Sequence, residues 1–164
     1  MNAGEVKCGV LMIYNDMTNL ALHVMWDAHR DQTDKAGIPY VFHPFHLAEQ
    51  FNDEVRCTVA LLHDVMEDSE VYTDEKLSDI FPDRVMIPLR LLTRRKCVKY
   101  SDYIDAISKN EIACDVKIAD LEHNLDSGRF YGSQFYLEES LVNRYIKAVV
   151  ALRKCRQRGE EGAS

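Results

Sequence analysis

The sequence lacks paired cysteines. Its five cysteines are odd in number and scattered along the chain, and no Cys-x-x-Cys pair occurs. A disulfide framework and a thiolate-bound structural zinc ion are therefore not expected. Unpaired cysteines of this kind are typical of reduced thiols, so we expect a cytoplasmic protein.

Long apolar runs and an excess of basic residues are also absent. No apolar run is long enough to cross a membrane, and the chain shows no signal peptide. The net charge of -7 argues against broad binding to nucleic acids or anionic membranes. It allows a small phosphorylated ligand that a metal ion and a few lysines hold locally. The oligomeric state stays open.

The composition is that of a globular protein, with 46% hydrophobic and 29% charged residues. The length of 164 residues fits one domain, residues 1–164. Apolar residues recur at helical spacing in successive segments, and no convincing strand pattern occurs, so we predict an all-α fold. We expect its motif-bearing core over about residues 18–130 and a closing helix over about residues 133–156.

The most informative stretch lies in a helix predicted over residues 54–68, with Asp53 as its cap. Beside its apolar stripe the helix carries His63, Asp64, Glu67 and Asp68. A buried carboxylate without a partner costs several kcal/mol, so such a group needs a cation or basic neighbours. A divalent metal ion would supply that charge. The alternative is a solvated acidic face with one stray histidine.

A second strip of polar residues is predicted in the helix that begins near Asn110. Ala113, Lys117, Asp120 and Asn124 fall on one narrow face of it. Lys117 is spaced to pair with Asp120, and the flanking apolar residues place this strip at the edge of a core.

The loop before residue 43 adds two further candidates. His43 precedes Pro44 at a predicted junction between loop and helix, where a side chain can point into a cleft. Lys35 lies in a Gly/Pro-containing turn and is either an anion contact or a solvated lysine. The basic cluster Arg94–Lys99 is open to the same two interpretations.

Two histidines and two carboxylates on separate segments suit one divalent metal ion: His43, His63, Asp64 and Asp120. Imidazole and carboxylate ligands without thiolate favour Mn, Fe or Zn. A metal ion of this kind lowers the pKa of bound water and neutralises charge developing on phosphorus. Glu67 and Asp68 would orient or deprotonate the water, and Lys117 and Lys35 would contact phosphate. The pattern therefore predicts metal-assisted hydrolysis of a phosphoester or phosphoanhydride.

These residues resemble the H…HD…D motif of the HD phosphohydrolase superfamily. The resemblance is closer to the hydrolase domain of the Rel/Spo-type alarmone enzymes, and especially to the small stand-alone Mesh-type hydrolases. It covers about residues 20–130 and rests on four segments: Ala28-His29-x-x-Gln32, Gly37-x-Pro39-Tyr40-x-x-His43-Pro44, Ala60-Leu61-Leu62-His63-Asp64-Val65-x-Glu67-Asp68, and Val116-Lys117-Ile118-Ala119-Asp120-x-x-His123-Asn124.

The resemblance implies an HD-domain helical bundle and Mn2+-dependent removal of the 3′-pyrophosphate of (p)ppGpp. It implies His43, His63, Asp64 and Asp120 as metal ligands, and Glu67 and Asp68 as the pair that handles the attacking water. Substrate contacts fall on two further positions, Asn124 and Ser127. The chain has no room for a synthetase domain, so alarmone turnover is expected to be degradative only.

One departure from the family concerns the loop Thr33-Asp34-Lys35, where relatives usually carry two or more basic residues. Asp34 therefore leaves the nucleotide open: an adenine alarmone, the 2′-phosphate of NADPH or a nucleoside monophosphate are alternatives. A non-catalytic nucleotide-binding module is the other alternative.

Overall fold

Helices build the whole described part of the protein. The computed structural model describes residues 12–130 and 135–162, and it contains no β-strand there, only an isolated bridge between Thr33 and Pro39. This confirms the predicted all-α fold. The α-helices are α1 (Asp16–His29), α2 (Phe42–Ala48), α3 (Glu54–Leu62), α4 (Val65–Asp68), α5 (Asp74–Ile80), α6 (Asp83–Leu92), α7 (Tyr100–Ile107), α8 (Glu111–Leu125) and α9 (Glu139–Gly162). A short 3-10 turn, η1 (Ser127–Phe130), follows α8.

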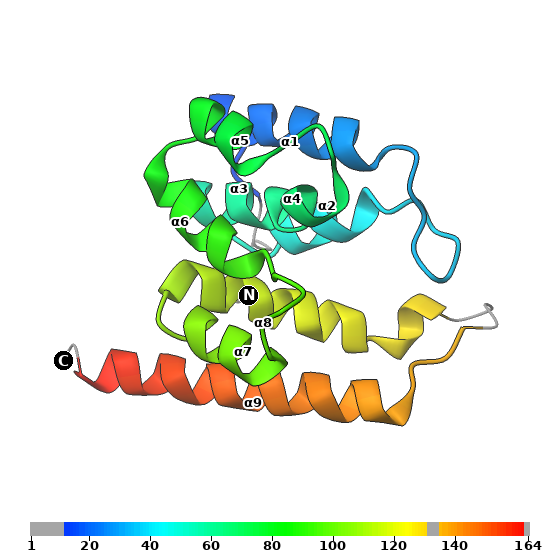
Figure 1. Ribbon diagram of the computed structural model, residues 1–164, viewed down its shortest axis with the longest axis vertical. Coiled ribbons are helices and arrows are strands. Elements are labelled where there is room, and N and C mark those ends of the chain that lie inside the picture. Colours follow the sequence, from blue (N-terminus) through cyan, green and yellow to red (C-terminus); the bar gives the residue numbers. More distant parts are fainter. Residues whose placement is uncertain (1–11, 131–134, 163–164) are drawn as a thin grey trace, which may run out of the picture.

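Helix α3 lies at the centre of the bundle. It contacts α1 and α2 on one side and α6 and α8 on the other, and α9 runs along α8 and α7 at the edge of the molecule (Figure 1). All residues of α3 from Cys57 to Leu62 are buried. One cluster of buried apolar residues joins α1 to α9, and the two segments that carry the predicted site, α3–α4 and α8, pass through it. In the described part of the chain, no helix is both long and apolar enough to traverse a bilayer.

The helix starts follow local capping chemistry. The side chain of Asp53 accepts a hydrogen bond from the backbone N–H of Arg56, and Asn110 accepts one from Ala113, at 2.8 and 2.9 Å. The closing helix begins later than predicted, at Glu139, because residues 135–138 are not helical. Residues 133 and 134 of that prediction lie outside the described residues.

The helix predicted over residues 54–68 is not continuous. Helix α3 ends at Leu62, His63 and Asp64 form a turn, and α4 starts at Val65. Asp64 has φ -103° and ψ -6°, in the right-handed region but displaced from ideal helical values, and its carbonyl accepts hydrogen bonds from the N–H groups of Glu67 and Asp68. No glycine or proline marks this break in the sequence. The break places the two predicted ligands between helices instead of on one helical face.

Candidate metal centre

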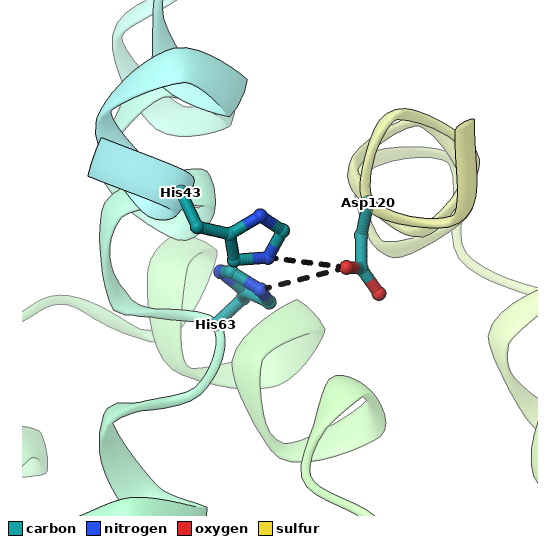
Figure 2. A group of neighbouring side chains, drawn as sticks. All are labelled: His43, His63 and Asp120. Carbon is teal, nitrogen blue, oxygen red and sulfur yellow. Dashed lines mark ion pairs between the residues drawn. The ribbon is translucent and has the colours of Figure 1, made fainter. Parts of the chain in front are cut away.

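Three buried side chains from separate elements meet in the middle of the bundle (Figure 2). His43 comes from α2, His63 from the end of α3 and Asp120 from α8. One ligand atom of each lies within 4.8 Å of the other two. The Asp120 Oδ1 atom is 3.2 Å from His43 Nε2 and 4.0 Å from His63 Nε2. This arrangement of imidazole nitrogen and carboxylate oxygen can hold a divalent metal ion.

Asp64, the fourth predicted ligand, lies at the rim of this group. Its Oδ2 atom is 2.9 Å from His63 Nε2 and 4.0 Å from His43 Nε2, and it accepts a hydrogen bond from the hydroxyl of Tyr40. On a regular helix, adjacent side chains diverge by about 100°. In the turn at residues 63 and 64, the two side chains nevertheless approach each other, with Asp64 Oδ2 next to His63 Nε2.

The two ring nitrogens of His63 are arranged so that one of them, Nε2, can bind a cation. Its Nδ1 atom is 2.8 Å from the carbonyl oxygen of Ala60, and because a carbonyl only accepts, Nδ1 carries a proton. Among the described residues the buried Nε2 atom has no hydrogen-bond partner, although Asp64 Oδ2 lies beside it. A lone pair facing a carboxylate needs a positive charge between the two. Without a metal ion a proton fills that place: burial opposes the charged ring, but Asp64 raises the pKa of His63 to about 9.

Asp120 is held by partners on both oxygens. The Lys117 Nζ atom lies 2.7 Å from Oδ2, and the Asn124 amide donates to Oδ1 at 2.5 Å. Burial favours the neutral carboxyl, but Lys117 lowers the pKa of Asp120 well below its usual value. In turn, burial opposes the charge on Lys117 while Asp120 raises its pKa well above the ordinary lysine value. Asp120 is therefore a carboxylate with a fixed orientation.

The acidic pair Glu67–Asp68 lies in α4 on the solvent side of this group. Together with Thr93, Arg94 and Lys96 it lines a surface pocket of about 610 Å³. Burial raises the pKa of both carboxyls, and Asp64 raises it further. The Glu67 carboxylate accepts a hydrogen bond from the backbone N–H of Arg94. The basic cluster Arg94–Lys99 therefore begins against the acidic pair.

A second pocket, of about 290 Å³, opens on the other side of His43. We call it the loop pocket. Its lining residues are Thr33, Asp34, Lys35, Tyr40, His43, Asn124, Arg129, Phe135, Leu137, Leu141 and Tyr145. His43 and Asn124 thus belong both to the loop pocket and to the surroundings of Asp120. Polar side chains of Lys35 and Asn124 and the ring of Phe135 offer contacts for a phosphorylated, partly flat ligand.

Asp34, the acidic residue at which the loop departs from the family, forms an ion pair with Arg129 in this pocket. Its Oδ1 atom accepts hydrogen bonds from the N–H groups of Ala36 and Ile38, at 2.8 and 3.0 Å. Its Oδ2 atom is 3.1 Å from Arg129 Nη2. Both oxygens are therefore engaged, and Arg129 compensates the negative charge that the loop carries at residue 34.

The remaining candidates differ in their placement. Ser127 starts η1 and is exposed, and it does not line the loop pocket. Lys117 is already bound to Asp120, so a substrate phosphate would have to share its amine. Sequence reasoning gave no role to Tyr40 and treated His123 as a packing or hydrogen-bonding residue. Each lies three residues from a candidate ligand, Tyr40 from His43 and His123 from Asp120, and that spacing was the available signal.

The chain is similar to known proteins in sequence and in fold. No family model matches the chain. A GTP pyrophosphokinase of Streptomyces coelicolor is 32% identical over 115 residues, which are 62% of this chain and 14% of that protein. A guanosine-3′,5′-bis(diphosphate) 3′-pyrophosphohydrolase of Haemophilus influenzae is 31% identical over 114 residues, 60% of this chain and 17% of that protein. The chain thus spans about a sixth of the length of the curated relatives it matches.

A solved structure shares the fold. It is a metazoan ortholog of SpoT that hydrolyzes ppGpp, with a TM-score of 0.65 and 22% identity, and the match covers 90% of this chain and 98% of that one. The helical bundle and the buried His/Asp group define an HD-type domain. Within that class, the chain is similar in sequence to part of the Rel/Spo-type alarmone enzymes.

Proposed function

We propose that this chain is a metal-dependent hydrolase that removes the 3′-pyrophosphate of guanosine 3′,5′-bis(diphosphate) or a closely related alarmone. The observation that carries the proposal is the contact between the buried His/Asp group and the loop pocket, to which His43 and Asn124 both belong. A nucleotide in that pocket would present a phosphate of its sugar to the metal centre. The names of the relatives support the same substrate class.

Each group of side chains has a proposed role. His43, His63, Asp64 and Asp120 would hold the metal ion, for which we propose Mn2+, with Fe2+ or Zn2+ as alternatives. When bound, such an ion acts as a Lewis acid and lowers the pKa of water. Glu67 and Asp68 would accept the proton of the attacking water, and burial, which raises the pKa of both carboxyls, makes them stronger proton acceptors.

The remaining candidate residues would bind and orient the substrate or support the metal centre. We propose that Lys35 and Asn124 contact the nucleotide from the loop pocket. Lys117 would act mainly by holding Asp120, because its amine is committed to that carboxylate. Ser127 does not line this pocket, so a contact of its hydroxyl with the nucleotide would lie outside it.

Product analysis tests the proposal. The Mn2+-loaded protein is incubated with ppGpp, and the nucleotides are separated by anion-exchange chromatography with an EDTA control. GDP and pyrophosphate that disappear on chelation are the expected result. Without turnover of ppGpp, the same assay with adenine alarmones, NADPH and nucleoside monophosphates identifies another substrate, and Asp34 is then the first residue to exchange. Failure with every nucleotide would refute the hydrolase proposal.

A further inference from the structure

The second ring nitrogen of His43, Nδ1, faces another histidine, His123. While His43 Nε2 faces Asp120, its Nδ1 atom lies 2.6 Å from Nδ1 of His123. The two rings are nearly parallel, with centroids 4.8 Å apart and planes 17° apart. His123 is in α8, three residues after Asp120, so one helix supplies both a candidate ligand and this contact.

A hydrogen bond between two imidazoles determines which nitrogen carries a proton. A cation at His43 Nε2 requires a lone pair there, so the ring proton lies on Nδ1 and points at His123. His123 must then accept at Nδ1 and carry its own proton on Nε2.

The ring of His123 is itself held in place. It also packs against the ring of His46: the centroids of the two rings are 4.5 Å apart, and their planes are inclined by 27°. A neutral acceptor adds no further negative charge beside Asp64 and Asp120.

We propose that His123 is a positioning residue that orients His43 toward the metal ion. The inference rests on the proposed metal centre and extends it, because His123 itself contributes no ligand atom. Partners of this kind fix the tautomer and orientation of a ligand histidine, and their loss commonly weakens metal binding about 10- to 100-fold. The usual partner is a carboxylate, a carbonyl or water; here it is a second imidazole.

Metal affinity, measured by calorimetric titration with Mn2+, tests the inference without any substrate. His123→Phe keeps an aromatic ring against His46 but removes the acceptor, and we expect affinity to fall about 10- to 100-fold. His123→Asn places an amide oxygen near the Nδ1 position and should recover most of the loss. His23→Phe, an equal change at an exposed position of α1, is the matched control and should bind like the wild type.

The outcomes separate the two proposals. Equal affinity of the wild type and His123→Phe overturns the positioning role, whereas a wild type that binds no metal overturns the metal centre itself. Circular dichroism checks that each variant folds. If His123→Phe does not fold, long-range 1H–15N spectra of the Zn2+-loaded wild type decide. A proton on Nε2 of His123 is expected, and a proton on its Nδ1 would contradict the inference.

Discussion

Exchange of Lys117 for methionine tests how the buried charges of the site are balanced. The Lys117 Nζ and Asp120 Oδ2 atoms are 2.7 Å apart, and the two side chains are only 15% and 7% exposed. Methionine fills a similar apolar volume but leaves Asp120 without this cation. Breaking a buried ion pair by removing one partner costs about 3–5 kcal/mol. Because His43 and His63 still face Asp120, we expect the lower end, a loss of about 3 kcal/mol.

A bound metal ion should reduce that loss. A divalent cation at the His/Asp group supplies charge to the same carboxylate, so we expect Lys117→Met to cost about half as much with Mn2+ as without it. Urea unfolding of the metal-free and Mn2+-saturated proteins measures both values.

Lys109→Met is the matched control. Lys109 also pairs with a carboxylate at 2.7 Å, that of Asp105, but the two side chains are 71% and 68% exposed. An exposed pair contributes about 0.3–0.5 kcal/mol, independent of metal. A cost for Lys117→Met no larger than that of the control, or a cost that Mn2+ does not change, would refute this account of the site.

Three further variants test individual side chains. His63→Ala should abolish the rise in melting temperature on adding Mn2+ while circular dichroism shows the helices intact; an unchanged rise would exclude His63 as a ligand. Glu67→Gln still accepts from the Arg94 N–H, so Mn2+ binding should persist while turnover falls about 100-fold or more, and lost Mn2+ binding would mean that Glu67 has another role. Tyr40→Phe removes the hydroxyl donor to Asp64, and calorimetry should show about 10-fold weaker Mn2+ binding; equal affinity would rule the hydroxyl out.

Local chemistry made most helices predictable. Asp53 caps a helix where its position in the sequence indicated, and the helical periodicity after Asn110 placed Lys117, Asp120 and Asn124 on one strip, where they form hydrogen bonds. Each of these contacts joins residues three or four apart, so a helical period is enough to anticipate it.

Contacts between distant segments could not be predicted in this way. The ion pair between Asp34 and Arg129 joins residues 95 positions apart, and the His43–His123 contact spans 80. Periodicity gives the face of one helix but not the partner that it meets. The sequence of the loop therefore indicated that Asp34 is acidic where the family is usually basic. Only the fold shows that Arg129 compensates the negative charge of Asp34.

The turn at His63 and Asp64 explains why the sequence pattern was misleading at the centre of the site. Residues 54–68 have helical propensity throughout and no breaker, so only tertiary interactions can favour the turn. One such interaction is the hydrogen bond that Asp64 accepts from Tyr40, and the local bond from His63 to the Ala60 carbonyl adds to it. The interruption replaces regular backbone hydrogen bonds by side-chain contacts that hold His63 and Asp64 beside His43 and Asp120. Local propensity is thus overridden where buried polar side chains from several elements assemble, as is common at functional sites.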